Sequence, residues 1–188
     1  MQAFQQALRA TGGGQVVVTD INPLSPTVYV ADRACRVPMS TDPDYLDAVA
    51  DICHREEIGL LVPTIDDELT LFADARDRFA ADGVTVVVSP PETTEACHDK
   101  VATARALAEK GVPAAPTWPP GEIPDAPVFP LFIKPRFGRG GVGAFPVRSP
   151  RELDFFLSYV PDPIVQPYLD GPEFTIDVLC GFDGAALA

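Results

Sequence analysis

The hydrophobic positions alternate between two periods over the first ninety residues. Stretches with apolar residues three or four apart, typical of helices, are separated by short valine-rich runs, typical of buried strands. The predicted helices cover residues 2–10, 44–57 and 66–81, and the predicted strands cover residues 15–20, 58–64 and 84–89. Helices that alternate with short buried strands form a parallel sheet. The pattern therefore predicts a Rossmann-like α/β domain over residues 1–90.

This predicted domain opens on a helix, whereas doubly wound sheets of this kind open on a strand and a glycine-rich turn. We therefore expect its first strand to be missing. Asp20 follows a strand but lacks the glycine fingerprint of dinucleotide-binding folds, so it is interpreted as a turn residue and a dinucleotide-dependent oxidoreductase is disfavoured. The acids of residues 64–68 suit a helix N-terminus, and they also lie where strand ends line ligand crevices. Capping is the favoured interpretation.

Prolines mark the next change along the chain. Pro90 and Pro91 end the first domain, and helices are predicted at residues 92–98 and 99–110. Residues 113–130 contain too many prolines for the interior of a helix or a sheet, which predicts an extended linker. The helical segment and the linker together form a predicted connection over residues 91–127.

A second α/β module is predicted over residues 128–188. The predicted strands cover residues 128–135, 144–147, 164–168 and 174–181, and a helix covers residues 150–159. The turn signal at residues 182–184 predicts that residues 185–188 begin a returning strand. We therefore expect the chain to stop within a hairpin, with this module incomplete at its C-terminus.

Composition restricts the partners more than the fold. The formal net charge of −13 argues against a nucleic-acid partner, because phosphate backbones require a basic surface. No apolar run approaches the ~20 residues of a membrane span and the N-terminus has no signal segment, so we expect a cytoplasmic protein with no membrane partner. The four cysteines lack paired spacing and are interpreted as reduced structural residues, and no metal ligand is assigned.

A lysine at the end of a predicted strand leads into a glycine-rich loop. Lys134 is followed by Arg136 and Arg139, and the loop covers residues 138–143. Glycines allow successive backbone N–H groups to point at anionic oxygens, and the neighbouring cations add charge. The lysine precedes the glycines and no helix follows directly, so this is not the nucleotide loop that ends in Gly-Lys-Ser/Thr. The alternative is an ordinary hairpin turn.

A second motif favours the phosphate interpretation. Residues 165–178 comprise a strand, a turn and a further strand that opens on Glu173. Together with the lysine strand and the glycine-rich loop, this segment resembles the ATP-grasp superfamily, whose two modules close on ATP. The likeness is greatest to the large chain of carbamoyl-phosphate synthetase and its single-copy relatives. It implies a preATP-grasp Rossmann-like domain, an α+β ATP-grasp lid module and the start of the last ATP-grasp subdomain.

The resemblance implies a nucleotide site built from several segments. Lys100 and Lys134 would bind phosphates, and Glu173 would accept from the ribose hydroxyls. The lid over the β- and γ-phosphates would consist of Gly138, Arg139, Gly140, Gly141, Val142 and Gly143. The hinge beside the adenine would consist of Gln166, Pro167, Tyr168 and Leu169. Each residue alone has an ordinary structural interpretation, and their order and spacing favour the nucleotide site.

The resemblance also implies a chemistry. ATP would convert a carboxylate, a bicarbonate or a carbamate into an acyl phosphate, which an amine then attacks. The implied cofactors are ATP and Mg²⁺, with the metal ligands expected beyond the end of this chain, and no catalytic residue is assigned. We therefore expect the chain by itself to bind ATP weakly or not at all and to be catalytically incomplete. A non-catalytic ATP-binding or regulatory module is the alternative, the small-molecule acid and amine are not identified, and a homodimer is left open.

Overall fold

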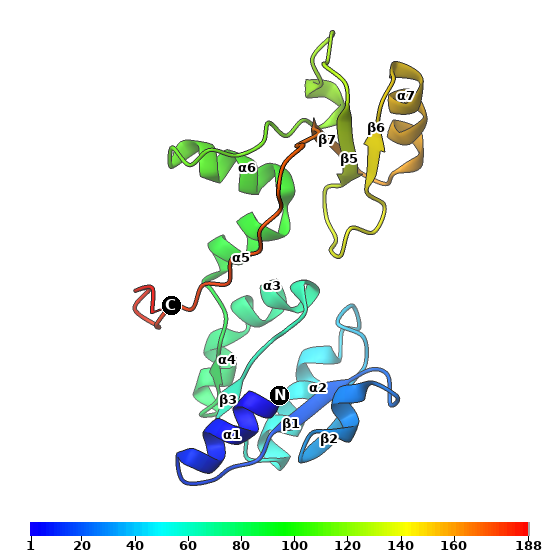
Figure 1. The fold of residues 1–188 in the computed structure, drawn as a ribbon. Helices are drawn as coiled ribbons and strands as arrows, with labels where there is room; N and C mark the ends of the chain where they lie inside the picture. Colours follow the sequence, from blue (N-terminus) through cyan, green and yellow to red (C-terminus); the bar gives the residue numbers. More distant parts are fainter. Residues whose placement is uncertain (188) are drawn as a thin grey trace.

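Two pairs of parallel strands lie at the centre of the N-terminal part of the protein, in a computed structural model that describes residues 1–187 (Figure 1). β1 (Val17–Asp20) pairs with β2 (Arg33–Arg36), and β3 (Leu60–Leu61) pairs with β4 (Thr85–Val86). The surrounding elements are α1 (Gln2–Ala10), the 3-10 turn η1 (Pro26–Tyr29), α2 (Tyr45–Arg55), α3 (Asp66–Asp74) and α4 (Arg76–Ala81). The parallel pairing predicted from the sequence is confirmed.

One hydrophobic core joins both strand pairs to helices α2, α3 and α4. Helix α2 places Tyr45, Val49 and Ile52 on one buried face at helical spacing. The ring of Phe72 packs edge to face against Tyr45 and Phe79, with centroids 6.0 and 5.6 Å apart. This aromatic core fixes α3, and with it the acidic first turn of α3, relative to the strands.

One prediction for this part is wrong in detail, and one strand was missed. The helix predicted over residues 66–81 is interrupted at Ala75, where φ of −88° and ψ of 2° lie in the bridge region. No proline or glycine marks this break in the sequence. Strand β2 was not predicted, because three of its four residues are exposed and only Cys35 turns toward the core. An exposed edge strand of this kind lacks the apolar alternation by which strands are predicted.

A bent pair of helices connects the two parts of the chain (Figure 1). Helix α5 (Pro91–His98) ends at Asp99, and α6 (Lys100–Glu109) begins directly after it. The linker that follows includes a 3-10 turn, η2 (Pro120–Glu122). Trp118 exchanges two backbone hydrogen bonds of 2.8 Å with Val165, so part of the linker is paired with the second sheet. The linker is therefore extended at Trp118, where its backbone pairs with the open edge of β7, a contact that the sequence did not indicate.

An antiparallel sheet with the order β6-β5-β7 forms the C-terminal part. Its elements are β5 (Leu131–Pro135), β6 (Phe145–Val147), α7 (Pro150–Tyr159) and β7 (Pro163–Pro167). The side chains of Ile133, Val147 and Val165 are fully buried between the sheet and its covering elements. The order and type of these elements agree with the prediction. Strand β5 alternates buried and half-buried positions and carries Lys134 near its C-terminal end.

The last segment differs from the prediction. Residues 174–181 form no strand, and their alternating apolar side chains, such as Phe174 and Ile176, are exposed. A strand requires a hydrogen-bonded neighbour, and no strand of residues 1–187 pairs along this segment. The predicted turn is present, because Cys180 and Ala186 form an antiparallel bridge around it. Residue 188, the end of the predicted returning strand, lies outside the described residues.

Candidate functional site

Lys100, the first residue of α6, is hydrogen-bonded to the root of the glycine-rich loop. Its backbone N–H donates to the carbonyl oxygen of Arg136 at 3.3 Å. Its Nζ donates to the same oxygen at 3.1 Å and to the carbonyl oxygen of Gly138 at 2.9 Å. A lysine ammonium group has three N–H donors, so one N–H of Lys100 remains for an incoming oxygen.

Asp99 holds the other side of this junction. Its Oδ1 accepts from Arg136 Nε at 2.8 Å and from the Val101 backbone N–H at 2.8 Å, and its Oδ2 accepts from Arg136 Nη2. The guanidinium of Arg136 is the main cause that lowers the pKa of Asp99 to about 2. Since Asp99 also caps α6, the start of this helix and the end of β5 are fixed to each other.

Lys134 lies half-buried in β5, with its Nζ 6.0 Å from the centroid of the Phe132 ring. Burial lowers the pKa of Lys134, and the positive charge of Lys100 lowers it further. Burial also lowers the pKa of Lys100. The structure thus brings the two predicted phosphate-binding lysines close enough to repel each other. An anion placed between them would reverse this repulsion.

The loop between β5 and β6 follows backbone conformations that favour glycine. Gly138, Gly140, Gly141 and Gly143 all have positive φ. At Gly143, where φ is 72°, a Cβ atom would also lie 3.1 Å from Pro135 Cγ. Between these glycines, Val142 is 81% exposed. The predicted lid is therefore an exposed loop whose path depends on its glycines.

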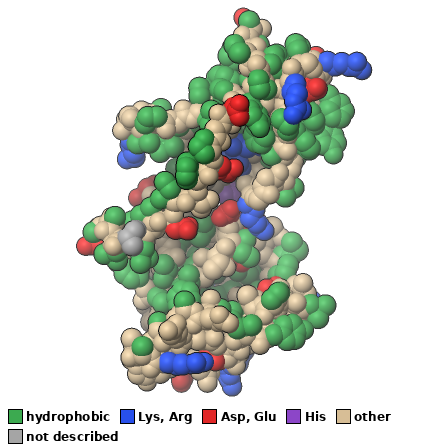
Figure 2. Space-filling view, in the orientation of Figure 1, with side chains coloured by type: hydrophobic (Ala, Val, Ile, Leu, Met, Phe, Trp, Pro, Cys, Tyr) green, Lys and Arg blue, Asp and Glu red, His purple; other side chains and the backbone are tan. Residues whose placement is uncertain are grey.

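Arg139 reaches from this loop to the N-terminal part of the protein. Its Nη1 forms an ion pair with Asp67 in the first turn of α3. The neighbouring Asp66 attracts the Lys100 ammonium group and raises its pKa, which opposes the effect of burial. Figure 2 shows acidic and basic side chains together in the hollow between the two parts of the molecule.

The acids of residues 64–68 lie in the first turn of α3, as expected of a helix N-terminus, but none of them caps the helix. The N-cap residue of α3 is Ile65, and no side chain caps the helix. Asp67 pairs with Arg139 of the loop, and the negative charge of Asp66 acts on Lys100 at the start of α6. The sequence could not indicate the partner of Asp67, because Arg139 lies 72 positions further along the chain. The only signal was the position of the acids after a strand of a parallel sheet, where ligand crevices form.

Gln166, the first residue of the predicted hinge, is bonded to the proline-rich linker. Its Nε2 donates to Thr117 Oγ1 at 2.7 Å, next to the two backbone hydrogen bonds between Trp118 and Val165. The side chain of Gln166 therefore has a structural role, and it holds the linker against β7.

The rest of the hinge offers few free backbone donors. Pro167 has no N–H group, and the N–H of Tyr168 donates to the carbonyl oxygen of Pro130 at 3.1 Å. The Tyr168 ring packs edge to face on Phe132, with centroids 6.3 Å apart. Among the described residues, the structure shows no acceptor for the N–H of Leu169. Leu169 is thus the hinge residue whose backbone can donate to a ligand.

Glu173, the predicted ribose-binding residue, lies in the exposed tail after β7. Within residues 1–187, the structure shows no hydrogen bond or ion pair between Glu173 and the two lysines or the glycine-rich loop. The structure therefore brings together Lys100, Lys134 and the loop, and leaves Glu173 outside this cluster.

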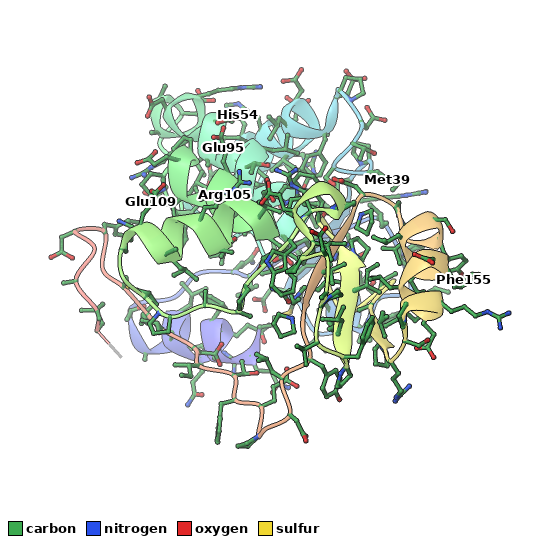
Figure 3. All side chains as sticks on the ribbon, turned by 90° about the horizontal axis from the view of Figure 1, so that it is seen from above. Met39, His54, Glu95, Arg105, Glu109 and Phe155 are labelled. Carbon is green, nitrogen blue, oxygen red and sulfur yellow. The ribbon has the colours of Figure 1, made fainter. Side chains whose placement is uncertain are left out.

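Two shallow hollows lie at other places on the surface. One is lined by Phe145, Arg148 and Phe155, and Phe155 projects from the outer side of α7 (Figure 3). The other lies where β1 and β2 end and is lined by Arg36 and Met39. Over residues 1–187, no three His, Cys, Asp or Glu side chains are close enough to hold a metal ion, and no helix is long and apolar enough to cross a membrane. The cluster of Lys100, Lys134 and the loop remains the strongest candidate site.

A parallel α/β domain, then a helix that begins with Lys100, then an antiparallel module with Lys134 and a glycine-rich loop is the arrangement that the ATP-grasp resemblance predicts. Comparison with known families agrees with this class. Residues 1–87 match the PylC-like, N-terminal domain, and residues 97–187 match the ATP-grasp domain. The resemblance to the ATP-grasp superfamily that the sequence indicates is thereby confirmed, and residues 1–87 are similar to a PylC-like N-terminal domain.

Individual relatives support the same classification. The chain is 25% identical to the carbamoyl phosphate synthase large chain of Deinococcus radiodurans over 197 residues, covering 94% of this chain and 18% of that protein. The L-amino acid ligase from Bacillus licheniformis has a TM-score of 0.71 and 20% identity, with 94% of this chain and 43% of that chain covered. The N5-carboxyaminoimidazole ribonucleotide synthetase from Thermus thermophilus has a TM-score of 0.68 and 16% identity, with 98% and 49% covered. The chain thus spans less than half the length of each relative, and the likeness to the solved structures shows the fold alone.

Proposed function

We propose that the protein is the ATP-binding portion of an ATP-grasp ligase that activates a carboxylate, a bicarbonate or a carbamate. The observation that carries this proposal is the convergence of Lys100, Lys134 and the glycine-rich loop at one place. Both lysines are partly desolvated, and the charge of Lys100 disfavours the charge of Lys134. A polyphosphate supplies the negative charge that this arrangement lacks.

Each group has its own role in holding the nucleotide. Lys100 donates its third N–H to a phosphate oxygen, and Lys134 adds a second positive charge from β5. The backbone N–H groups of residues 138–143 close over the phosphates. At the other end of the site, the Leu169 N–H contacts the adenine edge and the Glu173 carboxylate accepts from the ribose hydroxyls.

The proposed chemistry follows from the negative charge of the ATP phosphates, which such a site neutralises. ATP supplies the phosphoryl group that turns a carboxylate, a weak electrophile, into an acyl phosphate that an amine can attack. Phosphoryl transfer depends chiefly on positioning and on neutralisation of charge, and the two lysines and the loop provide both. Mg²⁺ bound with the nucleotide would neutralise further charge on the β- and γ-phosphates. The ligase assignment is supported by the similarity to a carbamoyl phosphate synthase large chain and to an L-amino acid ligase. The biotin carboxylase domain of the 2-oxoglutarate carboxylase from Hydrogenobacter thermophilus, which has a similar fold, was solved with MgADP and bicarbonate.

Isothermal titration of the full-length protein with ATP and Mg²⁺ tests the nucleotide site. Lys134→Ala removes one of the two cations and is expected to weaken ATP binding by about tenfold or more. Lys110→Ala serves as the matched control, with unchanged affinity expected. Lys110 follows α6 at the end of the helix that is remote from Lys100. Glu173→Ala is expected to weaken binding through the loss of the ribose contact. Unchanged affinity in both Lys134→Ala and Glu173→Ala would overturn the site assignment.

A non-catalytic ATP-binding module would share this site, so turnover distinguishes the two functions. The full-length protein is incubated with ATP, Mg²⁺ and mixtures of small carboxylates and amines, and release of ADP is measured. Release that requires both an acid and an amine supports the ligase. Tight ATP binding without acid-dependent release of ADP supports the regulatory module instead.

A further inference from the structure

Asp99 is the residue at which three elements of the candidate site meet. It follows α5 directly, it caps α6 through the Val101 N–H, and it holds Arg136 after β5 with both carboxylate oxygens. A carboxylate that only capped a helix would need the first of these bonds alone. The bidentate pair is partly shielded from water, since the Asp99 side chain is 15% exposed and the Arg136 side chain 34% exposed. Such a pair is stronger and more directional than a surface ion pair.

Arg136 is held twice, through its side chain by Asp99 and through its carbonyl oxygen by Lys100. The carbonyl accepts from both the backbone N–H and the Nζ of Lys100. Asp99 and Lys100 therefore both bind Arg136, one at its side chain and the other at its backbone. Lys134 precedes Arg136 by two positions in the same segment, so a displacement of Arg136 changes the distance between the two lysines.

We propose that Asp99 is a positioning residue of the phosphate site, which clamps Arg136 and so fixes the Lys100 ammonium group relative to Lys134. This inference rests on the proposed function of the site. Asp99 does not touch the nucleotide in this arrangement, because both of its oxygens are occupied by Arg136 and the Val101 N–H. Arg136 compensates its negative charge, so Asp99 can lie beside the phosphates without repelling them.

Two substitutions remove the clamp while they retain most of the local structure. Asn is as good an N-cap residue as Asp, so Asp99→Asn keeps the helix cap and loses the charge and one acceptor oxygen. Arg136→Lys keeps the positive charge and loses the planar fork needed for bidentate pairing. Each variant is expected to bind MgATP about tenfold more weakly than the wild type, with thermal unfolding used to show that it is folded.

Glu122→Gln is the matched control for these variants. It breaks the ion pair between Glu122 and Arg105, whose Nη2 and Oε1 atoms are 3.0 Å apart. Arg105 lies on α6, the same helix that Asp99 caps (Figure 3). Since this pair does not contact the lysines or the loop, Glu122→Gln is expected to leave MgATP affinity unchanged.

A double-mutant cycle with Lys100→Ala separates positioning from a general loss of structure. If Asp99 acts through Lys100, the effect of Asp99→Asn depends on the background. The substitution weakens MgATP binding about tenfold when Lys100 is present, and by less than about twofold in the Lys100→Ala background. Equal losses in the two backgrounds would overturn the positioning role, as would wild-type affinity in both Asp99→Asn and Arg136→Lys. If the wild type does not bind MgATP, the proposed function fails and the positioning role fails with it. A failure confined to Asp99 and Arg136 leaves the proposed function intact.

Discussion

Arg139 in the glycine-rich loop is paired with Asp67 in the first turn of α3, and this ion pair connects the two parts of the molecule. The side chains of Arg139 and Asp67 are 49% and 42% exposed. Helix α3 is anchored in the aromatic core by Phe72, whereas the loop is exposed. The pair therefore ties a glycine-rich loop to a rigid helix. It also places a carboxylate where the proposed function brings phosphates.

Asp67→Asn is expected to strengthen MgATP binding by about two- to fivefold, the range of a partly exposed ion pair. The substitution removes a negative charge that repels the phosphates, and it frees Arg139 for the ligand. Titration calorimetry at two salt concentrations measures the effect, which should shrink at the higher concentration because of screening.

Asp47→Asn is the control for this charge change. Asp47 pairs with Arg78 on the outside of the N-terminal part, with the Oδ1 and Nη2 atoms 2.6 Å apart and both side chains well exposed. Asp47→Asn alters the net charge by the same amount as Asp67→Asn and should leave the affinity for MgATP unchanged. Weaker binding by Asp67→Asn would contradict the competition between Asp67 and the nucleotide. It would show instead that the ion pair holds the loop in its binding conformation.

The affinity for MgATP is expected to fall with rising pH, and to begin falling below the ordinary lysine pKa of 10.5. Burial and the charge of Lys100 both lower the pKa of Lys134, so Lys134 loses its proton earlier than a free lysine. Only the protonated form attracts phosphate, so affinity is highest below the lowered pKa and is lost as pH rises through it. Lys134→Arg keeps its charge over this range and should show a weaker pH dependence. The measurement is a series of titrations at increasing pH, and identical profiles for the two proteins would remove Lys134 from the site.

Gly143→Ala is expected to destabilise the protein by about 1–2 kcal/mol, because an alanine is strained at positive φ. The φ of Gly143 is 72°, and the added Cβ would also lie 3.1 Å from Pro135 Cγ. Gly121→Ala is the matched control, since Gly121 has open space for a Cβ and no positive φ. Urea unfolding should therefore give a lower midpoint for Gly143→Ala and an almost unchanged midpoint for Gly121→Ala. Equal midpoints for the two variants would show that the loop takes another conformation in solution.

The elements with strong local signals could be predicted from the sequence. Helix α7 begins at Ser149, whose Oγ accepts from the Glu152 N–H at 3.3 Å, and the Ser-Pro-Arg-Glu segment is a recognisable helix start. The helical spacing of Tyr45, Val49 and Ile52 likewise indicates α2. In both cases the information lies within a few consecutive residues. The lysine and the glycine-rich loop of the candidate site were found for the same reason.

Features that depend on distant partners could not be predicted. The pairing of Asp67 with Arg139 and the clamp between Asp99 and Arg136 join residues 72 and 37 positions apart. The predicted strand at residues 174–181 has the right alternation, yet alternation alone forms no strand without a neighbour. The tertiary contacts that decide these features leave no periodic trace in the sequence.

Phe72→Ala tests whether the aromatic core holds α3 in place. Phe72 is 2% exposed and contacts the rings of Tyr45 and Phe79, so its truncation leaves a cavity and should cost about 3–5 kcal/mol of unfolding free energy. Phe155→Ala removes an equal number of atoms from a side chain that is 57% exposed on the outer side of α7 and should cost less than about 1 kcal/mol. Urea unfolding of both variants measures the difference. Similar losses would mean that the core does not depend on Phe72, and α3 would then lack the rigid anchor that makes Asp67 an effective partner for Arg139.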